Sequence, residues 1–99
     1  MINFKSPKII KMYSGHVSIE LTDSGTWESF PKFAKEYAKQ INAILIEEII
    51  APDMRFWQME INGIELKLIY DNFPNGISLE SDSDEADELL LALFELITH

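Results

Sequence analysis

Alternating apolar and polar residues dominate the middle of the chain, from residue 55 to residue 71. Two alternating runs meet there at Asn62-Gly63, a dipeptide that favours a two-residue hairpin turn because both residues accept a positive φ. This turn predicts that Ile61 faces Ile64 and that further pairs follow outward. The large apolar residues of both runs then share one face, and a slip of one residue would destroy that agreement. They are Trp57, Met59, Ile61, Ile64, Leu66 and Leu68.

The opposite face of this hairpin is mostly polar, so the hairpin is predicted to bury only one side. The register sets Glu60 directly opposite Glu65, a like-charge pair that costs roughly a few tenths of a kcal/mol. The residues of this face are Phe56, Gln58, Glu60, Glu65, Lys67, Ile69 and Asp71.

Two short runs near the N-terminus, residues 9–13 and 17–22, predict a second hairpin. Ser14-Gly15-His16 between them has the composition of a turn. Every other residue of the second run is apolar, which is typical of a half-buried strand.

The isoleucine-rich residues 43–50 predict a strand that ends at Ala51-Pro52-Asp53. Neighbouring strand residues point to opposite faces, so only one of Glu47 and Glu48 can be turned toward the helices. Residues 77–80 predict a last strand, after a segment composed almost entirely of turn residues.

Apolar residues at intervals of three and four predict a first helix after residue 26. Thr26 can accept hydrogen bonds from backbone amides at the N-terminus of this helix. Pro31 is comfortable only in a first turn, so the helix is predicted to begin between residues 26 and 30 and to end within 40–42.

A second helix is predicted after the capping residues 81–85, whose acids suit the positive end of a helix dipole. Its apolar residues continue to Ile97. Leu91 and Leu96 widen the apolar face, so this helix is either heavily covered or shares part of its face with a second chain.

The predicted order is therefore ββαββββα, in a single α+β domain spanning residues 1–99. The chain is 46% hydrophobic, which is enough to bury a core at this length. A mainly antiparallel sheet with both helices packed on one face buries all the apolar stripes.

Charge is distributed unevenly along the chain, whose net charge is −9. Residues 1–42 hold six lysines against four acids and have a net charge of +2. Residues 43–99 hold two basic residues against thirteen acids and have a net charge of −11. Such a field repels nucleic acid and anionic membranes and attracts a cationic partner.

Cysteine is absent from the chain, which excludes disulfides, thiol nucleophiles and thiolate metal sites. The first residues include Lys5, Pro7 and Lys8, which are incompatible with a signal peptide, and no apolar run reaches membrane-spanning length. We therefore expect a cytoplasmic protein that does not enter a membrane.

Catalytic and metal-binding patterns are weak throughout the sequence. His16 and His99 have no predicted partner for a pair of nucleophile and base. Asp82, Asp84 and Asp87 invite comparison with a calcium-binding loop. The match fails, because Ala86 occupies the third liganding position and Asp87 replaces the turn glycine, and helix capping explains the acids. We expect no enzymatic activity, no metal and no cofactor.

The acidic residues of the C-terminal half concentrate at strand ends, in loops and at the start of the last helix. One interpretation is a solvated surface that keeps the protein soluble. The other is a docking patch for a basic protein, where charge sets the association rate. Phe73 is either a plug under the sheet edge or an exposed interface anchor. The predicted binding residues are Glu47, Glu48, Asp53, Asp71, Phe73, Glu80, Asp82, Asp84 and Glu85.

Several motifs between Trp27 and Leu96 resemble those of a known group of proteins. They are W-x-x-F-P-x-F-A, R-x-W-x-x-x-x-x-G-x-x-L-x-L-x-Y-D, F-P-x-G-I-S-L-E and a leucine-rich terminal helix. In these features the chain resembles the immunity proteins of contact-dependent growth-inhibition systems. The resemblance implies a non-enzymatic inhibitor that binds one cognate toxin domain, often a basic nuclease, in the cytoplasm. It supplies no shared binding residues.

Three functions follow from these observations. The first is an immunity-type protein that neutralises a basic, nuclease-like toxin through its acidic surface, as a monomer or weak homodimer. The second is a structural or adaptor domain that self-associates through Leu91, Phe94 and the sheet edge. The third is a nucleic-acid mimic, which would require carboxylates in two rows spaced like phosphates.

Overall fold

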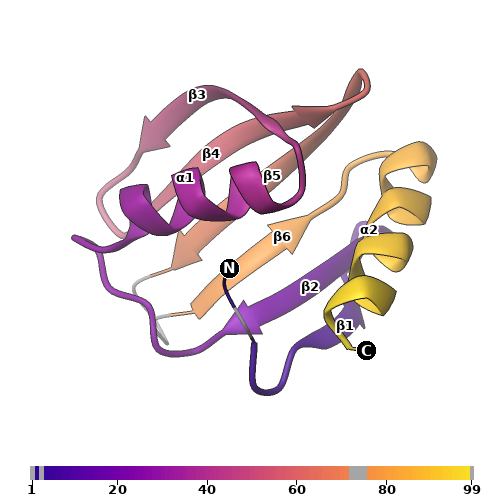
Figure 1. Cartoon of the computed structure of the whole chain (residues 1–99), viewed down its shortest axis with the longest axis horizontal. Coiled ribbons are helices and arrows are strands. Elements are labelled where there is room, and N and C mark those ends of the chain that lie inside the picture. The colour runs from indigo at the N-terminus through magenta and orange to yellow at the C-terminus, as the bar shows by residue number, and fades with distance from the viewer. Residues whose placement is uncertain (1, 3, 72–75, 99) are drawn as a thin grey trace.

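The computed structural model describes residues 2, 4–71 and 76–98. They form a six-stranded antiparallel sheet with two helices lying over the same face (Figure 1). The elements follow the order ββαββββα, so the predicted α+β architecture is confirmed. Their bounds are β1 Lys8–Lys11, β2 Val17–Thr22, α1 Phe30–Gln40, β3 Ile44–Ile50, β4 Met54–Ile61, β5 Ile64–Asp71, β6 Gly76–Glu80 and α2 Asp84–Ile97.

The strands lie side by side in the order β1-β2-β6-β5-β4-β3. β6 pairs with both β2 and β5, so the last strand in the chain joins the N-terminal hairpin to the central one. The N-terminal hairpin is confirmed, although its first strand covers residues 8–11 rather than 9–13. β1 and β3 are the two edges of the sheet.

The central hairpin has the predicted turn and register. Asn62 and Gly63 have φ values of 51° and 82°, as the two-residue turn requires. Ile61 pairs with Ile64, and the ladder continues without interruption to the far end of both strands. The apolar face of the hairpin therefore meets the helices.

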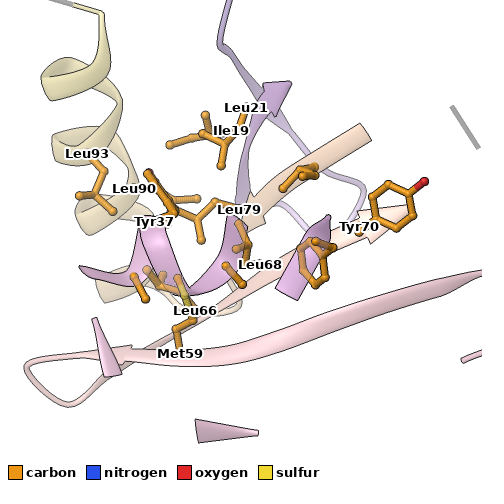
Figure 2. Packing of buried hydrophobic residues seen from close by; sticks show 14 of the residues in the cluster. Ile19, Leu21, Tyr37, Met59, Leu66, Leu68, Tyr70, Leu79, Leu90 and Leu93 are labelled. Atoms are coloured by element: carbon orange, nitrogen blue, oxygen red, sulfur yellow. The ribbon is translucent and has the colours of Figure 1, made fainter. Parts of the chain in front are cut away.

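The core lies between this sheet face and the two helices (Figure 2). Tyr37 of α1 and Leu90 of α2 are fully buried against it. Their neighbours come from four strands, so β2, β4, β5 and β6 share a single core. The buried strand residues are Ile19, Leu21, Met59, Leu66, Leu68, Tyr70, Ile77 and Leu79.

Helix α1 begins at Phe30, within the predicted range. Thr26 and Ser29 close a turn just before it, in which the Ser29 backbone NH donates to Thr26 Oγ1 at 3.0 Å. At the other end, Asn42 has a φ of 58°. The backbone NH of Ala43 donates to the Ala38 carbonyl and that of Asn42 to the Lys39 carbonyl, a Schellman ending that stops the helix.

Helix α2 begins after Ser83, whose hydroxyl accepts a hydrogen bond from the Ala86 backbone NH at 3.1 Å. This is the predicted cap. Leu91 and Leu96 are 49% and 75% exposed, so the outer part of the apolar face is not covered. Within the described residues, no helix has the length and apolar character needed to cross a membrane.

Strand β3 departs from simple alternation between Leu45 and Glu47, where a bulge shifts its register against β4. Beyond the bulge, Glu47 pairs with Gln58 and Glu48 with Trp57. Trp57 belongs to the core side of β4, so Glu48 is the glutamate that turns toward the helices.

Arg55 neutralises Glu48 inside the molecule. Its Nη2 and Nε lie 2.7 and 2.8 Å from Glu48 Oε2, and its Nη1 donates to the Trp27 carbonyl at 2.9 Å. The guanidinium also stacks over the ring of Trp27, 5.1 Å from its centre. Only 10% of the Arg55 side chain and 18% of the Glu48 side chain are exposed. This ion pair fastens the start of α1 to β3 and β4.

Replacing Arg55 with Leu should lower the free energy of unfolding by about 3 kcal/mol, because Glu48 would remain nearly buried without its counter-ion. The double variant Glu48→Leu/Arg55→Leu should recover most of that loss, since no charge is then left buried. Urea denaturation of both variants measures the difference. Equal destabilisation in the two variants would contradict this view of the pair.

Tyr37 is fully buried, and its hydroxyl has no hydrogen-bond partner within the described part of the chain. Burial raises the pKa of Tyr37 to about 12. Tyr37→Phe removes this unpaired hydroxyl and should leave the unfolding free energy unchanged or raise it by about 1 kcal/mol. Thermal denaturation tests this, and a loss of stability would reveal a hydrogen bond to the hydroxyl.

Candidate functional site

The two helices cover one face of the sheet and leave the other face open, as an antiparallel sheet permits. We refer to the uncovered side as the open face. Directly paired residues of neighbouring strands share a face, so the strand pairing defines rows of side chains across it. From β6 to β3, one row is Glu80, Lys67, Gln58 and Glu47, and the next is Ser78, Ile69, Phe56 and Ile49.

Acidic side chains gather on the open face at the end of the sheet that holds the β4–β5 turn. Glu60 and Glu65 stand opposite each other, and Glu80 and Glu47 end the neighbouring row. Asp82 is the second residue after β6 and is exposed. Strand spacings of about 4.8 Å place β3 and β6 about 14 Å apart. We name these five residues the acidic band.

Lys67 lies within the acidic band and does not neutralise it. Burial raises the pKa of Glu80 above its ordinary value, and the charge of Lys67 opposes part of that rise. The Lys67 ammonium also lies 5.4 Å from the centre of the Phe56 ring, so its charge is shared with an aromatic face. A second cation brought to Glu80 by a partner would favour the ionised carboxylate further.

A hollow of about 410 Å³ opens beside Glu80, between the β1–β2 turn and the loop that precedes α2. Tyr13 stands fully exposed at its rim. An aromatic ring next to carboxylates is a suitable environment for an arginine or lysine side chain. The lining residues are Met12, Tyr13, Ser14, Lys67, Glu80, Ser81 and Asp82.

The nine predicted binding residues do not form one patch. Glu47, Glu80 and Asp82 belong to the acidic band. Asp84 and Glu85 are exposed in the first turn of α2, directly after it in the chain.

The remaining four residues lie elsewhere. Asp71 pairs with Met54 and Gly76 at the opposite end of the sheet, and Asp53 immediately precedes this Met54. Glu48 faces the helices and is held by Arg55, so it is withdrawn from the open face. Phe73 lies outside the described residues.

Sequence reasoning missed Glu60 and Glu65 as members of the candidate site. The signal was present, because the hairpin register already set the two carboxylates against each other. A like-charge pair directly across two strands lowers stability, and such departures from local rules are expected at functional sites.

The sequence offered His16 no partner for a nucleophile-and-base pair; in the structure it contacts the Asp87 carboxylate, 71 positions away in the sequence. The His16 Nδ1 lies 2.9 Å from Asp87 Oδ2, and the Val17 backbone NH donates to Asp87 Oδ1 at 2.9 Å. Ser81 also hydrogen-bonds the carboxylate. These contacts, which we name the Asp87 clamp, join the start of α2 to the start of β2.

The clamp shifts the pKa of both partners. Hydrogen bonds from Ser81, His16 and the Val17 backbone lower the pKa of Asp87 from 3.8 to about 2. The hydrogen bond to Asp87 raises the pKa of His16 above 6.5, against a smaller opposing effect of burial. The charged forms of both groups are therefore favoured in the folded protein.

His16, Asp84 and Asp87 each offer a ligand atom within 4.8 Å of the other two. Both oxygens of Asp87 already accept hydrogen bonds from the protein. The Asp87 clamp explains why these described residues lie close together, and we assign no ion to the group.

Residues 8–98 match the family described as Protein of unknown function (DUF3630). The match covers all six strands and both helices. No curated protein and no solved structure matches the chain. The surface of the molecule is therefore the basis for assigning a function.

Asp87→Asn should remove a stabilisation that depends on pH. The lowered pKa of Asp87 gives stability above pH 3.8 that is lost as the pH falls toward 2. The raised pKa of His16 gives stability that is fully present below pH 6.5 and is lost as the pH rises through that raised pKa. The clamp is thus strongest between about pH 4 and 6.5. Thermal denaturation from pH 2 to 8 should show this maximum shrinking in Asp87→Asn but not in Glu95→Gln, a control at the other end of α2.

Proposed function

The chain belongs to the DUF3630 family of proteins of unknown function, and from its surface we propose a non-catalytic protein that binds a basic protein partner on its open face. The acidic band carries this proposal. Five carboxylates lie at one end of an uncovered sheet face, with Lys67 as the basic side chain among them.

Charge complementarity supports a protein partner with a cationic surface. Single exposed ion pairs contribute little, but a field summed over several carboxylates accelerates association with a partner of opposite charge. Glu60, Glu65 and Glu80 lie on paired strands, so the backbone that carries them loses little conformational entropy when the partner binds. The hollow beside Tyr13 provides a site for one basic side chain of the partner.

The apolar row next to the acidic band supplies the second requirement of an interface. On the open face, Ile69 and Phe56 are partly exposed and Ile49 is 37% exposed. Burial of apolar surface contributes most of the affinity at the centre of protein interfaces, while charges at the rim determine the rate and specificity of association. The open face offers both features side by side.

The resemblance to immunity proteins makes the proposed partner a toxin. In that form of the proposal, the protein resides in the cytoplasm and covers the active site or substrate-binding face of a basic, nuclease-like toxin domain. A nucleic-acid mimic has weaker support, because Lys67 and Gln58 interrupt the row between Glu80 and Glu47. A phosphate-like surface would need an unbroken row of negative charge.

Co-expression with the proteins encoded by adjacent reading frames, followed by affinity capture, tests the proposal. The expected result is a complex with a basic protein and survival of cells that produce it. Failure to capture any such protein, together with no protection from it, would contradict the function.

A double variant, Glu60→Gln/Glu65→Gln, tests the acidic band itself. Binding of the captured partner at low salt should weaken by about tenfold through a slower association rate, because two charges of the steering field are lost. The variant should fold at least as stably as the parent, since it removes a like-charge pair. Glu36→Gln/Glu95→Gln, on exposed helix positions, makes the same charge change and should bind normally. Equal effects of both double variants would refute a localised site.

A further inference from the structure

The two edges of the sheet differ in their protection. β1 is four residues long and begins and ends with lysine, Lys8 and Lys11, which discourages another strand from pairing with it. β3 is seven residues long and contains neither lysine nor proline. Proteins usually shorten, charge or cover such an edge because its unpaired backbone groups invite a further strand.

The exposed side chains of β3 are unusually apolar for an edge strand. Ile44, Ile46, Ile49 and Ile50 are 64%, 47%, 37% and 60% exposed. Together they leave uncovered about as much surface as two whole isoleucine side chains. Seven residues span about 23 Å, and the exposed Glu47 lies between the isoleucines at the two ends of this edge.

A second copy of β3 complements this edge in one antiparallel register. A twofold axis between Ile46 and Glu47 sets Ile44 opposite Ile49 of the other copy, and both belong to the open face. It also sets Leu45 opposite Glu48, and both belong to the helix side. In this register no glutamate meets a glutamate, and in both of these pairs the two residues belong to the same face.

The glutamates of β3 do not prevent this pairing. Glu48 is neutralised by Arg55 of its own chain, so it brings no free charge to the contact. Glu47 would meet Ile46 of the second copy. The main opposition is the net charge of −9 on each molecule, which acts at longer range and is screened by salt.

We propose that β3 pairs with β3 of a second copy of this chain, joining two six-stranded sheets into one continuous sheet. The contact involves one strand and four exposed isoleucines per molecule, which is small for a stable dimer. It is therefore a weak dimer, with a dissociation constant in the micromolar range. Added salt strengthens it, whereas salt weakens the binding of a basic partner.

Sedimentation over a range of protein and salt concentrations tests the pairing. The parent protein should shift from monomer to dimer at micromolar concentration, and the dimer fraction should rise with salt. Ile46→Glu should weaken the dimer at least tenfold, because it sets a carboxylate directly opposite Glu47 of the second copy. Ile10→Glu on β1 is the matched control, because Ile10 is 44% exposed at the opposite edge, and it should leave the dimer intact.

The absence of cysteine makes the register testable by cross-linking. A mixture of Ile44→Cys and Ile49→Cys proteins should form mixed disulfides readily, because directly opposed Cβ atoms lie near the distance that a disulfide needs. Ile49→Cys alone should cross-link poorly, since the two copies of residue 49 lie about 17 Å apart in this register.

Three results would overturn the proposal. A parent protein that stays monomeric at millimolar concentration has no such contact. A dimer that dissociates on Leu96→Lys but not on Ile46→Glu uses the exposed face of α2 instead. A monomeric protein whose basic partner is lost on Ile46→Glu uses the β3 edge to bind a strand of that partner. The first two results do not depend on whether the acidic band binds a basic protein.

Discussion

Asn62 and Gly63 fix the relation between β4 and β5, and most of the molecule depends on that relation. The two-residue turn aligns the strands so that most of the large apolar residues of the hairpin point to one side. β6 and β3 pair with the outer edges of this hairpin, so the hairpin register also determines which of their side chains face the core and which face outward. A shift of one residue would exchange the core for the open face across the central sheet.

Two polar contacts connect the helices to this sheet. The Arg55–Glu48 pair ties the start of α1 to β3 and β4, and the Asp87 clamp ties the start of α2 to β2. They differ in chemistry and therefore in how they respond to conditions. The nearly buried Arg55–Glu48 pair resists screening by salt, whereas the clamp includes His16, which loses its charge as the pH rises through its raised pKa.

Local sequence signals predicted the parts of the fold that depend on neighbouring residues. The hairpin register, the Ser83 cap and the ending of α1 each follow from a few adjacent side chains, and all three agree with the structure. Contacts between distant segments could not be predicted in the same way. The contact between His16 and Asp87 requires β6 to lie beside β2, and no local pattern specifies that arrangement.

The candidate site was predicted in part for the same reason. The excess of acids in the C-terminal half was evident from the sequence, but their distribution in space depends on strand order. The bulge in β3 decides that Glu48 turns inward while Glu47 remains outside, and alternation alone could not choose between them. The sequence already showed Glu60 and Glu65 as opposed charges. They become part of a larger acidic surface only because β6 places Glu80 beside them.

The acidic band and the β3 edge are parts of one surface. Ile49 ends the apolar row of the open face and also stands at the proposed dimer contact. In the proposed register, Ile44 of the second copy extends that row, and Glu60 and Glu65 of the second copy follow it across the sheet, so the apolar row of each copy would end beside the acidic band of the other. A dimer would then present two binding sites to its partner, which increases avidity when both are engaged. Low salt would favour capture of a basic partner and high salt would favour pairing of the copies, so ionic strength separates the two events.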